Sequence, residues 1–209
     1  MASKPSPPDD SGGTPAFSRR SFLKTAGVGA AATTMVGVGA KARAAQVLGP
    51  DAVGLSLKVN GSIHPVTVEP RVTLLEALRN HLDLTGAKQV CDRGACGACT
   101  VLLDGEPVNS CLVLAADAEG HEITTVEGIG TPEKMSPLQA AFVEKDAMQC
   151  GFCTPGFVVS GTALLSKVPN PTLDQIKAGL AGNLCRCGTY GRVFEAVHAA
   201  AAAKPAKKG

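Results

Sequence analysis

The chain has 209 residues, of which 44% are hydrophobic, 18% are charged and 3% are aromatic. This composition is that of a folded protein rather than a disordered one, and the length allows one or two domains. The formal net charge is +2, but six basic side chains lie in residues 1–44, so the body of the chain is mildly acidic and unsuited to bind nucleic-acid phosphates.

The first segment has the order of an export signal. Residues 1–17 are rich in Pro, Ser and Gly, which predicts disorder. Arg19 and Arg20 then precede a weakly apolar run that is too short for a stable membrane span, and Ala-x-Ala at 42–44 offers a cleavage site. The pattern predicts a disordered tail plus a twin-arginine signal peptide over residues 1–44, and a periplasmic protein. A retained anchor and a chance arginine pair remain the alternatives.

Two alternating segments open the mature chain. Residues 53–59 and 62–68 alternate apolar and polar side chains, and Asn60-Gly61 between them predicts a β-hairpin. Pro65 lacks an amide hydrogen, so the second strand is expected at a sheet edge or a bulge.

A helix and further strands complete this first part. Thr73 and Glu76 have capping-box spacing and predict a helix that reaches Leu82. Strands are expected at the ranges 100–103, 106–108 and 121–126. The sequence therefore predicts a small α+β domain over residues 53–126.

The second half has a helical period. Residues 127–135 are expected to form a linker before a helical domain over 136–203. Ser136-Pro137, Thr154-Pro155 and Thr172 with Gln175 predict helix starts. Helices are expected from these starts to about residues 147, 167 and 180, with a fourth over about 191–203, and short links between them favour a compact bundle.

The eight cysteines fall into two groups of four, one in each predicted domain. The first group reads C-x4-C-x2-C-x11-C and the second reads C-x2-C-x31-C-x-C. Four thiolates are the ligand set of a [2Fe–2S] cluster, and the first spacing is that of a plant-type ferredoxin. The small residues Gly94, Ala95, Gly97 and Ala98 let a backbone wrap closely and turn amide N–H groups toward sulfur.

Two other uses of the cysteines remain open at this point. Exported proteins often join an even number of cysteines in disulfides, which would make the chain a stapled binding module. Each group of four thiolates also suits structural zinc. Iron–sulfur clusters are favoured because the loop residues are small and the spacing is poor for long covalent staples.

Three segments resemble a known family. The ranges 88–112, 149–156 and 182–192 resemble the iron–sulfur subunit of molybdenum hydroxylases, the xanthine dehydrogenase and aldehyde oxidoreductase family, and the order Gly188-Thr189-Tyr190 is similar to the periplasmic aldehyde oxidoreductase type. The resemblance covers residues 53 to 200 and includes the spacing of all eight cysteines. The family usually has glycine where this chain has Val90, which could alter the local backbone.

This resemblance implies an α+β chain with a ferredoxin-like β-grasp domain followed by a four-helix bundle. It implies two [2Fe–2S] clusters and a molybdenum cofactor held mainly by a partner subunit, whose pterin Gln149 and Cys187 would touch. The ligands it implies are, for the outer cluster, Cys91, Cys96, Cys99 and Cys111, and for the inner cluster, Cys150, Cys153, Cys185 and Cys187.

The function implied is electron transfer with no substrate chemistry on this chain. A large molybdenum subunit would oxidise an aldehyde or an N-heterocycle by hydroxylation, and the clusters would pass electrons to a flavin (FAD) subunit or a cytochrome. The alternative is a stand-alone exported ferredoxin-type carrier. His64, His81, His121 and His198 form no ligand pattern, and Arg93 and Arg186 either offset cluster charge or are simply solvated.

Overall fold

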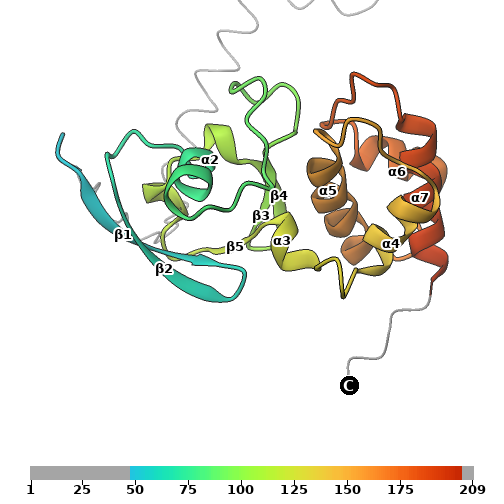
Figure 1. The fold of residues 1–209 in the computed structure, drawn as a ribbon, viewed down its shortest axis with the longest axis horizontal. Coiled ribbons are helices and arrows are strands. Elements are labelled where there is room, and N and C mark those ends of the chain that lie inside the picture. Colours follow the sequence, from blue (N-terminus) through green and yellow to red (C-terminus); the bar gives the residue numbers. More distant parts are fainter. Residues whose placement is uncertain (1–47, 204–209) are drawn as a thin grey trace, which may run out of the picture. The chain divides into compact units, whose positions relative to one another are not determined.

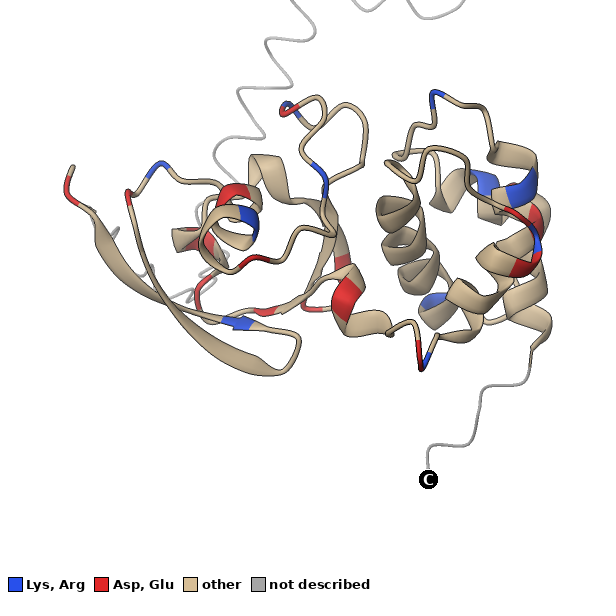
Figure 2. Cartoon of the chain, viewed as in Figure 1, with Lys and Arg blue, Asp and Glu red and all other residues tan. Residues whose placement is uncertain are grey.

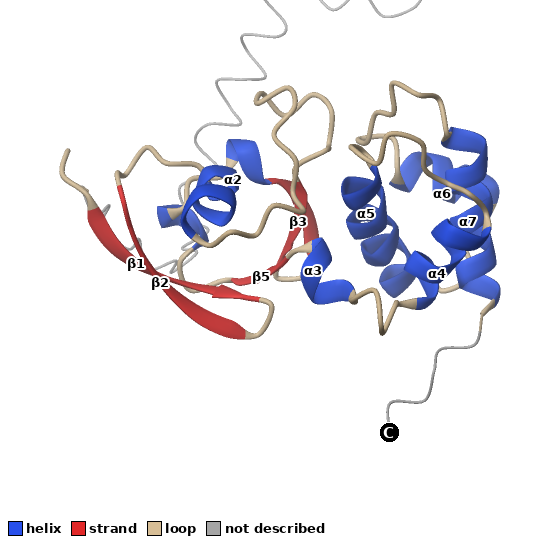
Figure 3. Ribbon diagram, viewed as in Figure 1, coloured by secondary structure: helices blue, strands red, loops and turns tan. Residues whose placement is uncertain are grey.

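A computed structural model of the protein describes residues 48–203. The disordered tail and the export signal predicted over residues 1–44 lie outside these residues. Within them, a mixed α+β structure places strands in the first part of the chain and helices mainly in the second, so the predicted α+β class is confirmed (Figures 1 and 3).

In the described residues the strands form a five-stranded sheet with the order β2-β1-β5-β3-β4. The β1–β5 pair is parallel, and the other neighbouring strands pair antiparallel. Four strands lie within one residue of their predicted ranges, and the fifth, expected over 121–126, is shorter because residue 126 already begins a helix. Their bounds are β1 Val53–Val59, β2 Ser62–Val68, β3 Thr100–Leu103, β4 Glu106–Asn109 and β5 Glu122–Thr124.

The turn residues explain the two hairpins. Asn60 and Gly61 join β1 to β2 with φ of 52° and 82°, and Asp104 and Gly105 join β3 to β4 with φ of 51° and 84°. Positive φ at both central residues gives a turn whose twist matches that of the strands. Pro65 lies in β2 at the edge of the sheet, where its missing N–H costs no ladder bond, as predicted.

A short helical segment covers the sheet. The predicted capping box is present, because Thr73 and Glu76 bond to each other's backbone at the start of α2, Leu74–Glu76. The helix then continues as a π-helical turn, Ala77–His81, instead of one regular helix to Leu82. Two single 3₁₀ turns follow later, Ser110–Leu112 and Ala116–Ala118.

The first hydrophobic core lies between this segment and the sheet. It includes two cysteines, Cys99 and Cys111, so candidate cluster ligands belong to the core itself. Its largest fully buried side chains are Leu57, Leu74, Leu75, Leu78 and Ile123.

The helices of the second part begin mostly where capping residues predicted. Ser136 caps α4, Pro137–Glu144, and Thr172 caps α6, Leu173–Gly179, each through a full capping box. Helix α4 ends three residues before the predicted end. The remaining helices are α3 Val126–Ile129, α5 Thr154–Lys167 and α7 Tyr190–Ala202.

One expectation about the helices needs correction, and the segment expected as a linker carries structure of its own. Thr154 does not cap α5: the cap residue is Cys153, no side chain makes the cap bond, and the Thr154 hydroxyl is buried without a hydrogen-bond partner. The cap therefore falls on a candidate ligand. Residues 127–135, expected as a linker, contain most of α3 and a turn closed by Thr131 and Lys134.

Helix α5 joins the sheet to the other helices. Its Val159 and Ala163 pack against Leu102 of β3 in a separate core cluster, while Phe157 and Val158 belong to the helical core. Figure 2 shows that α5 carries almost no charge along its length, as expected for a helix packed on both sides. At its end, Lys167 pairs with Glu106 of β4 at 2.5 Å.

Candidate metal centre: two groups of four cysteines

The first group of cysteines lies on the loop that enters β3 and on the turn that follows β4. Cys99 and Cys111 are buried, whereas Cys91 and Cys96 are half-buried. The loop bends tightly because Gly94 and Gly97 both have φ of 70°, a left-handed conformation that glycine adopts at little steric cost.

Within this group the thiols influence one another in pairs. The Cys96 side chain acts on the pKa of Cys91, and the Cys111 side chain acts on the pKa of Cys99. The backbone N–H of Arg93 and the Cys96 side chain lower the pKa of Cys91 to about 7, while burial raises the pKa of Cys99 to about 11. A bound cation stabilises the thiolate form in both cases, since a metal ligand is deprotonated.

Backbone amides also turn toward the sulfurs, as the small loop residues predicted. The N–H of Gly94 donates to Cys111 Sγ at 3.3 Å. The Asn109 side chain donates to the Gly94 carbonyl at 3.1 Å and fixes this part of the loop. Asn109 was not singled out in the sequence, although its position two residues before Cys111 was a usable signal.

The second group joins the loop before α5 to the loop before α7. Cys185 is buried, Cys153 is half-buried, and Cys150 and Cys187 are exposed. Cys153 pairs with Cys185, and Cys150 pairs with Cys187. Burial and the neighbouring Cys185 raise the pKa of Cys153 to about 12.

Cys185 has polar neighbours that sequence reasoning missed. Its Sγ lies 3.1 Å from Thr189 Oγ1, and its N–H donates to the Tyr190 hydroxyl at 2.8 Å. Burial acts to raise the pKa of Cys185, but hydrogen bonds from Thr189, the Cys153 side chain and the Gly188 N–H together lower it to about 7. Thr189 stands four residues after Cys185 and immediately before α7, so the turn through Gly188, with φ of 80°, brings its hydroxyl back to the sulfur.

One backbone hydrogen bond connects the two groups. The N–H of Leu184 donates to the carbonyl of Cys96 at 2.9 Å, and Leu184 precedes the ligand candidate Cys185. A single hydrogen bond and a few covalent bonds therefore separate a cysteine of the first group from a cysteine of the second.

The other predicted site residues are exposed. Gln149, Arg93 and Arg186 are all exposed, and Gln149 directly precedes the exposed Cys150. Val90 is 56% exposed and is absent from the positive-φ positions, so valine is accommodated there without a left-handed backbone. His121 lies 2.6 Å from Asp104, at the sheet turn and outside both cysteine groups.

The arrangement suits two-metal clusters. All eight cysteines lie in the described residues and are free thiols, so the disulfide alternative is not what the structure shows. Across residues 48–203 no three His, Cys, Asp or Glu side chains gather as they would around one ion. The cysteines come in two pairs per group, and two thiolates for each iron is the ligand count of a [2Fe–2S] cluster. The residues therefore fit this cofactor.

Family models match three parts of the chain. Residues 57–125 match a 2Fe-2S iron-sulfur cluster binding domain, and residues 125–198 match a [2Fe-2S] binding domain. Residues 16–36 match the twin-arginine translocation pathway signal sequence, which addresses the chain to the periplasm. None of the helices in residues 48–203 has the length and apolar character needed to cross a bilayer.

Relatives cover most of the chain. It is 40% identical over 202 residues to the aldehyde oxidoreductase iron-sulfur-binding subunit PaoA of Escherichia coli O157:H7, with 88% of each chain covered. It is 49% identical over 147 residues to the nicotine 6-hydroxylase small subunit of Paenarthrobacter nicotinovorans, covering 70% of this chain and 88% of that one.

Solved structures agree in fold. Quinoline 2-oxidoreductase from Pseudomonas putida 86 is similar with a TM-score of 0.70 and 42% identity, over 73% of this chain and 95% of that one. The aldehyde oxidoreductase from Desulfovibrio desulfuricans is similar with a TM-score of 0.69 and 43% identity, over 71% of this chain and 17% of that longer one.

Proposed function

The chain belongs to the iron–sulfur subunits of the molybdenum hydroxylases, and from this premise we propose how its residues divide the work of electron transfer. It is an electron-transfer subunit with two [2Fe–2S] clusters, and in these enzymes the molybdenum cofactor belongs to the partner subunit. Each bound cluster supplies one-electron redox chemistry. The observation that carries the proposal is that eight free thiols fall into two groups of four, each bordered by glycines with a left-handed backbone.

The ligand assignment follows the pairs. Each pair of neighbouring thiols would hold one iron, so each group holds one cluster. The outer cluster would be held by Cys91, Cys96, Cys99 and Cys111, and the inner one by Cys150, Cys153, Cys185 and Cys187. The Gly94 N–H and the Thr189 hydroxyl would stabilise negative charge on sulfur.

The exposed edge of the second group is the side offered to the molybdenum subunit. Gln149 and Cys187 would touch the pterin, since both are exposed and Gln149 adjoins Cys150, the pair partner of Cys187. An amide side chain can donate to and accept from a heterocycle edge. Electrons would thus enter at the second group and leave from the first.

The fold details belong to the same proposal. Residues 53–126 would form a β-grasp domain for the outer cluster, joined through residues 127–135 to a four-helix bundle over 136–203 for the inner one. The sheet with its covering helical segment and the helices α4 to α7 support this division.

The substrate class we propose for the complex is an aldehyde or an N-heterocycle. The relative PaoA is named for aldehyde oxidation and is 40% identical over 202 residues, and the nicotine 6-hydroxylase subunit is 49% identical over 147. The onward acceptor would be a flavin subunit or a cytochrome that docks near the outer cluster.

Two cysteine variants of the assembled complex test the assignment. Cys187→Ala should remove the electron paramagnetic resonance signal of the inner cluster and stop electrons from an aldehyde reaching the outer one. Cys96→Ala should remove the outer signal only, because each variant deletes one ligand of one group. If Cys187→Ala instead changed only the outer signal, the division of the cysteines into two groups would be wrong.

Purification from the native host tests the alternative function. A stable monomer without a partner subunit would favour a free electron carrier.

A further inference from the structure

One carbonyl oxygen in the first cysteine loop receives an unusual set of donors. The Gly97 carbonyl accepts from Asn183 Nδ2 at 2.9 Å, from the Thr100 hydroxyl at 2.6 Å and from the Thr100 N–H at 3.1 Å. Gly97 lies between Cys96 and Cys99, and Asn183 lies two residues before Cys185. The Asn183 side chain therefore ties the loop of one cysteine group to the loop of the other.

This contact is buried and internally satisfied. Asn183 is 4% exposed and Thr100 is 6% exposed, and the Asn183 amide also reaches Thr100 Oγ1 at 3.3 Å. Removing a donor from the buried Gly97 carbonyl would cost free energy, so the Asn183 amide is held in one position. It reinforces the neighbouring hydrogen bond from Leu184 N–H to the Cys96 carbonyl.

Glycines bring the same backbones to their closest approach. A methyl group at Gly156, in α5, would overlap the Gly97 carbonyl oxygen and come within 2.9 Å of Asn183 Nδ2. A methyl group at Gly97 would overlap the Gly182 carbonyl oxygen. Since interiors are close-packed, any added atom here must push the two loops apart.

We propose that Asn183 and Gly156 are positioning residues that set the separation of the two clusters. The inference rests on the proposed ligand assignment. Asn183 pulls the loops together through the Gly97 carbonyl, and Gly156 leaves the space that lets them meet. The transfer they serve moves one electron from the reduced to the oxidised cluster and makes or breaks no bond.

Two variants and one matched control test this in the assembled complex. Gly156→Ala adds one methyl group in a helix, where alanine is the better helix former, yet it fills the contact. Asn183→Asp keeps the shape but replaces the donor with an acceptor that repels the Gly97 carbonyl. Gly182→Ala is the control, because a methyl group there meets no atom within 4 Å in the same loop.

The readouts separate spacing from assembly. Both variants should keep the iron content and both resonance signals, but the magnetic splitting between the clusters in the dithionite-reduced complex should weaken. Electron redistribution between the clusters, followed by rapid freezing after partial reduction, should slow several-fold, because the rate of electron transfer falls steeply as the distance between the clusters grows. Gly182→Ala should match the wild type in both measurements.

Three outcomes would overturn the inference. Unchanged splitting and transfer rate in both variants would show that the contact does not set the spacing. An equal effect in Gly182→Ala would show that any change in this loop disturbs the clusters. Loss of a cluster from both variants would show that the contact serves cluster assembly rather than spacing. Failure of the underlying assignment would appear differently, as a wild-type complex that lacks two distinct cluster signals.

Discussion

Gly94 has a left-handed backbone and also donates a hydrogen bond to a candidate ligand. Comparing it with a second left-handed glycine separates these two effects. Gly94 has φ of 70°, and its N–H donates to Cys111 Sγ. Gly105 has φ of 84° in a hairpin turn with open space around it, so it carries the same conformational demand away from the cysteines. A non-glycine residue in this conformation costs about 1–2 kcal/mol at either position.

Gly94→Ala is therefore expected to shift the reduction potential of the outer cluster, whereas Gly105→Ala is expected to leave it unchanged. The exposed Leu112 side chain can move away from the new methyl group, so the strain of the left-handed backbone is relieved by turning the loop that aims the N–H at sulfur. Redox titration of the outer resonance signal measures the shift. Equal potentials in the two variants would remove the proposed role of this N–H.

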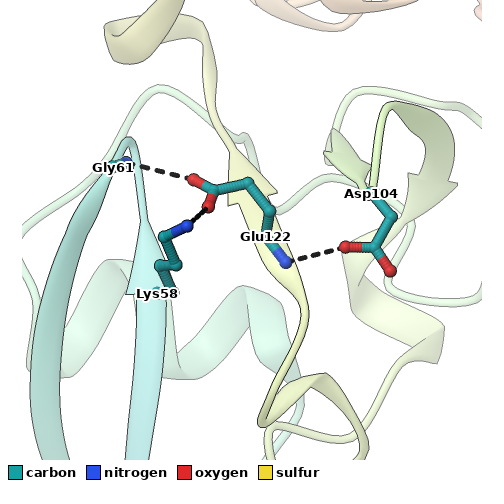
Figure 4. Close-up of polar contacts among 4 residues, drawn as sticks. All are labelled: Lys58, Gly61, Asp104 and Glu122. Carbon is teal, nitrogen blue, oxygen red and sulfur yellow. Dashed lines mark hydrogen bonds and ion pairs between the residues drawn. The ribbon is translucent and has the colours of Figure 1, made fainter.

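Charge at one carboxylate anchors the first hairpin to the sheet. Glu122 of β5 accepts from the Gly61 N–H at 3.1 Å and pairs with Lys58, while its own N–H donates to Asp104 at 2.8 Å (Figure 4). The Lys58 ammonium and then the Gly61 N–H hold the pKa of Glu122 below its usual range.

The pH dependence follows from the sign of that shift. A lowered pKa in the folded state gives stability that is complete above the unfolded value of about 4.3 and is lost as pH falls through the lower, folded value. Glu122→Gln should thus shrink the difference in melting temperature between pH 7 and pH 3. Glu133→Gln, at an exposed position in the turn before α4, is the control; an unchanged difference in Glu122→Gln would contradict the assignment.

At the scale of elements, α5 is the helix whose packing should matter most. Val159 is 1% exposed and lies against Leu102 of the sheet, whereas Val143 of α4 is 57% exposed. Val159→Ala should lower the free energy of unfolding by about 2 kcal/mol through lost burial and a residual cavity. Val143→Ala should change it by less than about 0.5 kcal/mol. Urea denaturation of both variants measures the difference, and equal values would deny α5 this role.

The elements also show what the sequence could predict. Asn60-Gly61, Ser136-Pro137 and the Thr73–Glu76 spacing act locally, through turn geometry and capping bonds, so the hairpin and the starts of the two helices were placed correctly. Thr154-Pro155 has a similar local pattern, yet its cap was wrong because a tertiary requirement puts Cys153 at that position.

The site shows the same limit. Cysteine spacing predicted both groups of four, because the spacing of ligands along the chain reflects cofactor geometry. Asn183 and Gly97 are 86 residues apart and meet only through the fold, so no local pattern could reveal their contact. Long-range contacts of this kind are what the sequence pattern leaves undetermined.

For the whole molecule, cluster binding and folding should be coupled in both halves. Cys99 and Cys111 belong to the first core and Cys185 to the second. Removing iron with a chelator under reducing conditions should therefore lower the melting temperature and broaden the transition, because the ligand groups lose the cation that holds them. Circular dichroism of loaded and stripped protein measures this; equal melting temperatures would show that the thiols do not need the metal for packing.

The burial of Cys99 and Cys111 should also affect how long the chain survives in the cell. In a cell starved of iron, the chain would lack the metal that holds these buried thiols in the core, and incompletely folded chains are degraded by proteases. The steady-state abundance of the subunit should then follow nutrient iron even when its transcription does not change.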